Sequence, residues 1–247
     1  MDVFNCDFGI IYFELEPPQT NDQLIEIINW LNNTKKEIRA IDITLGYSPM
    51  LELFMNTFRR NISQLTIFHY DGRIEYDDVV YKHLNFEIKN SFYSHPFSLF
   101  NLDFLLSMDT EKILPYRSYF SARELNIFLR SWQEGKTNQK LKEIFFIIWP
   151  KADVKEILKG CRGELMDPRT TRLKFREVGS DNHREFWIYG GIYIRRNDGH
   201  LAVIGGCCCR EGENVSEYNI EEYLKHVEDW NSENRTWYVE GFRIFTF

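Results

Sequence analysis

The sequence is poor in glycine and proline, with 14 Gly and 7 Pro among 247 residues, which excludes a collagen-like or low-complexity chain. No apolar run approaches the ~18 residues of a membrane-spanning helix. The longest candidate, residues 144–149, has the length of a buried strand. A basic region typical of a secretory signal is missing at the N-terminus. We therefore expect an intracellular protein, cytoplasmic or nuclear, without a membrane partner.

The sequence has few cysteines, and their number is odd: Cys6, Cys161 and the adjacent Cys207, Cys208 and Cys209. Neighbouring residues on a strand point to opposite faces, so the triplet cannot enclose a metal tetrahedrally. The pattern favours reduced, packed thiols in a reducing compartment. A thiol activated by the neighbouring Arg210 is the alternative.

Recognisable catalytic motifs are missing as well. The chain has no HExxH, no GxSxG, no P-loop and no GxGxxG. Asp71, Asp77 and Asp78 could act as general bases in a cleft, but no acid stands at a diagnostic spacing, and a surface loop is the favoured interpretation. The same holds for the six histidines, which we interpret as one strand-end residue, His69, and five surface residues: His83, His95, His183, His200 and His226. We expect no catalytic residues, no cofactor and no metal, and hence a protein that is not an enzyme.

The overall charge does not indicate nucleic-acid binding, because the net charge of the chain is −7. Residues 1–34 carry six acids and neither Lys nor Arg. One basic stretch runs against this trend: Arg162, Arg169, Arg172, Lys174, Arg176, Arg184, Arg195 and Arg196. We interpret it as a solvated face interleaved with acids. A patch for an acidic partner such as a nucleic acid is the alternative.

What the sequence does contain is hydrophobic and aromatic residues, at 43% and 16% of the chain, arranged as alternating strands and helices. Thr20–Gln23 and Ser121–Glu124 match the capping box that begins a helix. The helices that follow have apolar stripes at helical spacing: Leu24, Ile27, Ile28 and Leu31 in the first, and Leu125, Phe128, Leu129 and Trp132 in the second. Further helices are predicted from Ser48 and over 152–159 and 218–230.

Strands are predicted at 9–15, 38–45, 64–69, 84–88, 99–106, 112–116 and 141–149. The centres near 43 and 67 lie 24 residues apart, within the ~20–29 residues of leucine-rich repeats, although the strict Leu/Asn ladder is missing. We therefore predict an α/β protein in which residues 1–160 form an irregular, leucine-rich-repeat-like strand–helix solenoid.

The last third of the sequence differs from the first part, because its pattern predicts mainly strands. Strands are predicted at 171–178, 185–189, 191–196, 201–207 and 237–247. A hairpin turn is expected at Asn197-Asp198-Gly199, and Gly190-Gly191 indicates a bulge or sharp bend. We expect residues 161–247 to be a β-rich C-terminal part containing hairpins, packed on the first part to form one continuous body.

Several segments together resemble the nematode F-box-associated domain of the F-box B group, type 2. The resemblance rests on residues 100–149, with Leu102-Asp103 and the helix residues Leu125, Asn126, Phe128, Leu129 and Trp132, and on the hairpin segment 189–204. Residues 27–45 are similar to the region upstream in such proteins. The resemblance implies a substrate-recognition module of an SCF-type ubiquitin ligase, with no catalytic residues to carry over.

The chain departs from the family pattern at its front. An F-box is a helical segment that usually opens with Leu-Pro, and no Leu-Pro occurs before Leu114-Pro115. We expect the F-box to be missing, so binding to the ligase adaptor subunit is not assumed, and the protein target and its binding surface stay unknown. A truncated or degenerate family member without ligase coupling is the alternative. A nucleic-acid-binding protein and an enzyme with an unrecognised site rank below both.

Overall fold

The computed structural model describes residues 7–46, 48–69, 83–95, 100–116, 118–177, 184–210 and 213–247. They form a ten-stranded mixed sheet, a three-stranded antiparallel sheet and helices. The predicted α/β class is therefore confirmed in the coarser form of a mixed α/β fold, and no solenoid is detected in the described residues.

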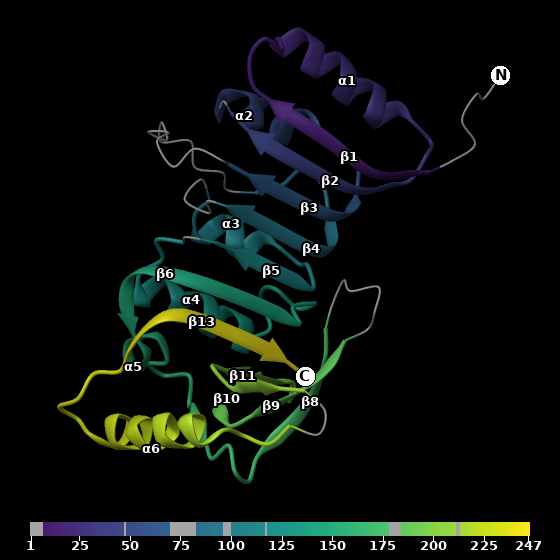
Figure 1. Ribbon diagram of the computed structural model, residues 1–247. Coiled ribbons are helices and arrows are strands. Elements are labelled where there is room, and N and C mark those ends of the chain that lie inside the picture. The colour runs from purple at the N-terminus through teal and green to yellow at the C-terminus, as the bar shows by residue number, and fades with distance from the viewer. Residues whose placement is uncertain are drawn as a thin grey trace.

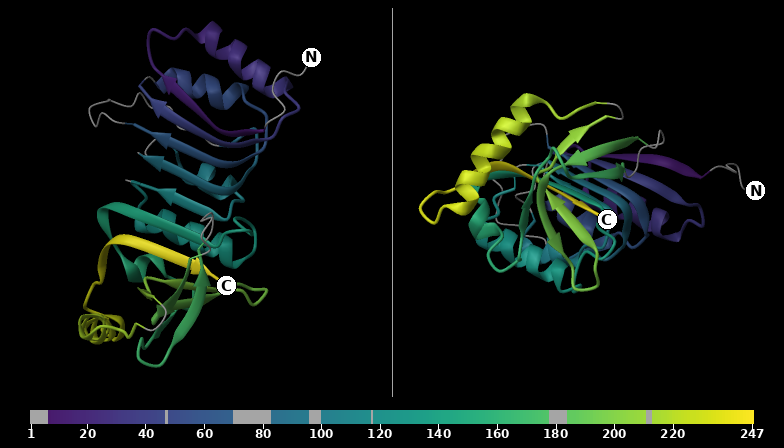
Figure 2. Two further views of the ribbon diagram at one scale, coloured as in Figure 1. Left: turned by 45° about the vertical axis from the view of Figure 1, so that its right-hand side comes forward. Right: turned by 90° about the horizontal axis from the view of Figure 1, so that it is seen from below.

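The first six strands follow one another across the large sheet in chain order, each parallel to its neighbours (Figure 1). They are β1 (Phe8–Leu15), β2 (Ile38–Leu45), β3 (Ile62–Phe68), β4 (Ile88–His95), β5 (Lys112–Pro115) and β6 (Glu143–Asp153). Parallel neighbours need a crossover connection, and the helices α1 to α4 that occur between these strands lie along one face of the sheet (Figure 2).

Five helices lie along the parallel half. They are α1 (Asn21–Asn33), α2 (Ser48–Thr57), α3 (Leu102–Ser107), α4 (Ala122–Gln133) and α5 (Val154–Ile157). Both predicted capping boxes are confirmed. The amide of Gln23 donates to Thr20 Oγ1 at 3.3 Å, and that of Glu124 donates to Ser121 Oγ at 3.2 Å. Each cap satisfies amides that the first helical turn leaves without a partner.

The main core lies between these helices and the sheet. Leu24, Ile28 and Leu31 of α1 are buried there, as are all four stripe residues of α4. Inward-facing strand residues such as Ile43, Ile67 and Phe92 meet them and are fully buried. Ile27, the remaining apolar residue at helical spacing in α1, is 41% exposed and lies beside the edge strand β1.

Four antiparallel strands extend the same sheet beyond β6. They are, in spatial order, β13 (Tyr238–Thr246), β11 (Leu201–Ile204), β10 (Gly191–Arg195) and β7 (Glu164–Met166). The small sheet consists of β12 (Cys207–Cys209), β9 (Glu185–Tyr189) and β8 (Arg172–Arg176), and α6 (Glu217–Asn231) lies beside both (Figure 1). The hairpin predicted at Asn197-Asp198-Gly199 joins β10 to β11, with Gly199 at φ +96°.

The predicted bend at Gly190-Gly191 is where the chain leaves the small sheet for the large one. Both glycines have positive φ, +60° and +91°. A Cβ on Gly191 would lie 2.8 Å from the carbonyl oxygen of Ile204. Glycine is required here for both reasons, conformation and close approach.

Two predicted strands were wrong. Residues 85–86 form a bend and β4 begins only at Ile88; just before it, the amide of Glu87 donates to Asn61 Oδ1 at 3.0 Å. The strand predicted at 99–106 is helix α3, capped by Asn101, whose Oδ1 accepts the amide of Phe104 at 2.9 Å. Leu99 lies outside the described residues. The strand predicted at 201–207 breaks at Gly205, and the three-residue β7 was not predicted.

Candidate protein-interaction surface

The sheet face opposite α1–α4 presents two rows of side chains across the parallel strands. Register places Tyr12, Asp42, Thr66, Tyr93 and Leu114 in one row, and Glu14, Thr44, Phe68 and His95 in the next. Their strand neighbours point into the core, because side chains alternate along a strand. We call the aromatic part of this surface, Tyr12, Phe68, Tyr93, His95 and Tyr116, the open aromatic face.

Rings on this face form two contacts. The centroids of Phe68 and Tyr93 are 5.1 Å apart, and His95 stacks on Tyr116 at 4.6 Å. Burial, and next the neighbouring Tyr116, raises the pKa of the Tyr93 phenol, so its hydroxyl stays a neutral donor at physiological pH. Aromatic rings with a polar tip are the residues enriched in protein interfaces.

A charged cluster bounds the face where β5 and β6 meet β13. The Glu143 carboxylate is only 1% exposed, with Lys112 Nζ at 3.0 Å and Arg243 Nε at 3.0 Å. Lys112 also lies 3.4 Å from Glu177, at the end of β8. Opposite charges so placed offset the cost of burying the Glu143 carboxylate.

The small sheet covers the same side beyond this cluster. Phe175 of β8 packs on Phe245 of β13 with centroids 4.8 Å apart, and Phe186 and Phe247 join them. With Ile188 and Val203 they form a second core, separate from the one under the helices. The open aromatic face therefore ends at β6, and among the residues that the structure describes none covers it over β1–β5.

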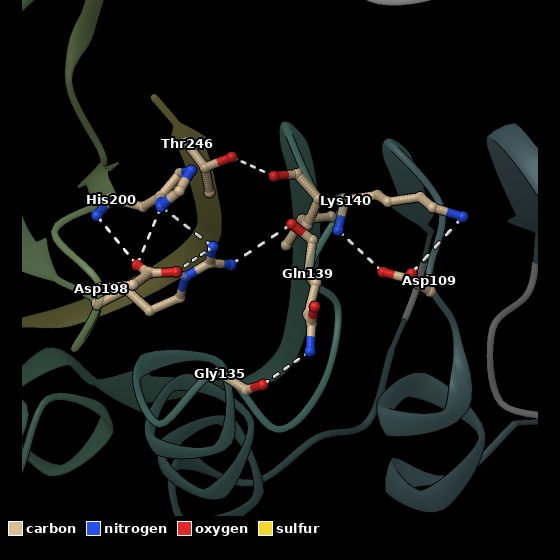
Figure 3. A network of polar contacts seen from close by, with 9 residues as sticks. Asp109, Gly135, Gln139, Lys140, Asp198, His200 and Thr246 are labelled. Carbon is tan, nitrogen blue, oxygen red and sulfur yellow. Dashed lines mark hydrogen bonds and ion pairs between the residues drawn. The ribbon is translucent and has the colours of Figure 1, made fainter.

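Figure 3 shows how the β10–β11 hairpin is held against the loop after α4. Arg196 Nε donates to Asp198 at 2.9 Å, and the Nη1 of Arg196 donates to the Gln139 carbonyl at 3.4 Å. His200 Nδ1 lies 2.9 Å from Asp198 Oδ1. The hydrogen bond from Arg196 holds the pKa of Asp198 well below its usual range. Since Arg196 is 8% exposed and lies over the Trp132 ring at 5.6 Å, we assign these residues a structural role.

The cysteine triplet alternates as predicted. Cys207 Sγ and Cys209 Sγ lie 3.6 Å apart, whereas Cys208 Sγ lies 4.0 Å from the carbonyl oxygen of Gly206. Burial raises the pKa of Cys207 to about 12 and that of Cys161 to about 11, and the pKa of Cys208 is also raised. An activated thiol needs a lowered pKa, and the shifts of Cys207 and Cys208 are in the opposite direction.

The other polar candidates do not converge. His69 lies directly after β3 and is 7% exposed, as predicted for a strand-end residue. Asp71, Asp77, Asp78 and His183 lie outside the described residues. Within the described ranges, no group of three or more His, Cys, Asp or Glu side chains could hold a metal ion, and none of the helices there is long and apolar enough to cross a membrane.

The basic stretch is interleaved with acids as predicted. Arg169 pairs with Asp167 at 2.5 Å, Lys174 with Glu185 at 2.6 Å and Arg196 with Asp198 at 2.7 Å. A polar cleft is lined by four arginines, Arg130, Arg162, Arg195 and Arg196, but also by Glu134 and Glu164. A nucleic-acid backbone is bound by a more uniformly positive surface than this.

Residues 80–146 match the F-box associated family, and no F-box is detected in the chain. The match confirms the resemblance over residues 100–146. Segments 27–45 and 189–204 lie outside it. No curated protein and no solved structure matches the chain.

The described part of the matched segment contributes β4, α3, β5, α4 and the start of β6. Tyr93, His95 and Tyr116 of the open aromatic face belong to it, and Tyr12 and Phe68 do not. Sequence reasoning had named no partner-binding residues, although it had placed His95 at the surface. The period-two alternation of strand 9–15, with Ile10 and Tyr12 on its polar side, was the one signal that could have found part of them.

Proposed function

We propose that this protein is a substrate-recognition module that binds a protein target through the open aromatic face and carries out no chemistry of its own. The observation that carries the proposal is the pair of ring contacts, Phe68–Tyr93 and His95–Tyr116, on a sheet face that no described helix covers. Phe68 and Tyr116 remain 37% and 38% exposed. Such rings bury large areas at low entropic cost when a partner docks.

We also propose that residues 1–160 act as an irregular repeat of leucine-rich-repeat type, and residues 161–247 as a β-rich part closing its end. The chain order of β1–β6 and the placement of helices on one face support this. In repeat proteins the face built by successive strands is the extended binding surface. The continuity of the sheet from β6 into β13 supports treating both parts as one body.

Proximity labelling with a double variant, Phe68→Ala with Tyr116→Ala, tests target binding. Tyr218→Ala is the matched control, because Tyr218 is 68% exposed on α6, far along the chain from the face. The double variant should lose the enriched partners of the wild type while keeping its circular dichroism spectrum. Retention of the same partners by the folded double variant would refute the proposal.

Coupling to a ubiquitin ligase is a separate part of the proposal. Its alternative is a truncated or degenerate family member that binds a target without a ligase. A pull-down of the chain with the purified ligase adaptor subunit distinguishes them. Capture of the adaptor at micromolar concentration supports coupling through these 247 residues, and no capture supports recognition without it.

A further inference from the structure

The first strand of the protein is an edge. Within the described residues, β1 pairs with β2 alone, whereas the opposite edge of the large sheet is β7. β7 has three residues, and β1 has eight, a length of roughly 26 Å. Very short edge strands are one way in which proteins avoid unwanted strand pairing. β7 has that protection and β1 does not.

Other common protections are missing from β1 as well. The strand, FGIIYFEL, contains no Lys, Arg or Pro. Its register to β2 is continuous from Ile10 to Leu15, without a bulge. Ile10 and Tyr12 are 51% and 72% exposed. A long, flat, apolar edge is a template for another strand.

A groove of about 460 Å³ follows this edge between the strand and α1. Four of its lining residues are large, exposed hydrophobics: Ile10, Tyr12, Ile27 and Trp30. Trp30 is 57% exposed, and its ring meets Phe8 edge-on at 5.6 Å. Trp and Tyr anchors around a groove are typical of interface hot spots.

One buried polar atom in the groove lacks a partner. Gln19 lines it, and its Oε1 is buried without a hydrogen bond in the described structure. A buried acceptor without a donor is unfavourable, because nothing compensates the loss of its hydrogen bonds to water. A donor supplied by an incoming chain would remove that cost, so this atom points to a ligand independently of the free edge.

Charge indicates what kind of chain fits. Glu14 is the one charged residue among those lining the groove. From Asp7 to Thr34 the chain has five acids and neither Lys nor Arg: Asp7, Glu14, Glu16, Asp22 and Glu26. A second copy of this chain would bring the same carboxylates to one seam, and like charges across paired strands are destabilising. A basic partner has the complementary charge.

We propose that the β1 edge binds an extended, Lys- or Arg-containing segment of a partner protein by strand addition. Backbone hydrogen bonds along β1 provide affinity, and an apolar side chain of that segment enters the groove beside Trp30 and Ile27. A donor of the segment satisfies Gln19 Oε1. The inference rests on the proposed function, since it names the chemistry of the target beside the open aromatic face, with which it shares Tyr12.

An array of ten-residue peptides, alternating aromatic or β-branched residues with Lys, tests the proposal against the whole chain. The expected result is binding that falls at least tenfold with Ile10→Lys or Trp30→Ala and is unchanged by Ile127→Lys, a control at a 41% exposed isoleucine on α4. Two sets of peptides are N-methylated, one at the odd and one at the even positions. Only one set should lose binding, because only every second amide of an added strand faces β1.

Three results would overturn it: no binding by any Lys peptide, equal binding by peptides with Glu in place of Lys, or equal binding by both N-methylated sets. Sedimentation showing a dimer that Ile10→Lys dissociates would assign the edge to a second copy instead and would also overturn it. The outcomes separate the two proposals. If the Phe68→Ala/Tyr116→Ala variant loses its cellular partners while the Ile10→Lys variant keeps them, strand addition fails and target recognition stands.

Discussion

Arg243 of the last strand and Glu143 of β6, one hundred positions apart, pair across the middle of the sheet, with Arg243 Nε 3.0 Å from Glu143 Oε1. The guanidinium also lies over the Phe245 ring at 4.7 Å. Glu143 belongs to the matched family segment and Arg243 does not. The pair therefore fastens the C-terminal part to the end of the open aromatic face.

Arg243→Ala should destabilise the fold. Removing one partner of a buried ion pair typically lowers the free energy of unfolding by ~3–5 kcal/mol. Because Lys112 remains 3.0 Å from Glu143, we expect Arg243→Ala to lower it by about 2 kcal/mol. Urea unfolding measures the change as a shift in midpoint at constant slope. Glu143→Gln is the matched variant, and it should cost less because it removes the buried charge itself. Equal stability of Arg243→Ala and wild type would contradict this assignment.

Asn138 is a buried residue with φ +52° in the loop after α4. Its Nδ2 donates to the carbonyl oxygens of Leu105 at 3.0 Å and Met108 at 2.7 Å, at the end of α3. Asn138→Ala loses both bonds and adds left-handed strain, so we expect a loss of about 2–3 kcal/mol. Asn138→Gly relieves the strain and should be about 1 kcal/mol less harmful. A lower thermal unfolding midpoint for Asn138→Gly than for Asn138→Ala would show that the backbone conformation at this position is unimportant.

The docking of α6 should depend on pH. The helix has no fully buried residue, and its His226 stacks on Trp237 at 3.9 Å. Burial lowers the pKa of His226 from 6.5, although Glu222 and Asp229 oppose the shift and Lys225 adds to it. Between the lowered pKa of His226 in the folded state and 6.5, the unfolded state binds more protons at this residue than the folded state does. The free energy of unfolding therefore rises with pH in this range, and the contribution of neutral His226 is lost as the pH falls below 6.5.

Hydrogen exchange over residues 217–231 at pH 7 and pH 5, corrected for intrinsic rates, measures this effect. Protection of α6 should fall at pH 5 relative to that of β2 and β3. His226→Phe keeps the aromatic stack without a titrating group and should flatten the difference. An unchanged difference in His226→Phe would assign the pH dependence to another group.

Residues 1–160 should not fold alone. β6 pairs with β13 from Glu143 to Asp153, and Phe242 and Ile244 of β13 are 2% exposed in the main core. Cutting the chain after residue 160 would leave β6 as a long apolar edge, which favours aggregation. Expression of this fragment should give insoluble protein. A soluble fragment with cooperative unfolding would show that the two parts are independent domains.

The sequence predicted the strands and helices whose signals are local. The capping boxes at Thr20 and Ser121 and the Asn197-Asp198-Gly199 turn each depend on a few neighbouring residues, and all three are confirmed. Helix α3 was missed because its six residues are too few for a period, and its Asn101 cap was overlooked. β7 was missed because three residues have no pattern of their own and it is held by pairing with β10.

The open aromatic face and the exposed residues beside β1 could not be predicted from the sequence for a different reason. The open aromatic face collects single residues from separate strands, such as Phe68 and Tyr93, whose alignment depends on register. Ile27 matched the α1 stripe, and its exposure follows from β1 having no further strand beside it in the described structure. Neither register nor sheet order is encoded in a local pattern.

The central claim, target recognition through the open aromatic face, is tested most directly by site-specific photo-crosslinking in cells. A benzophenone amino acid replaces Tyr116 on the face or, as the control, Tyr218 on α6. We predict that position 116 yields a discrete crosslinked protein on irradiation and that position 218 does not. The same crosslinked protein at both positions, or none at position 116 in a folded chain, would contradict the account.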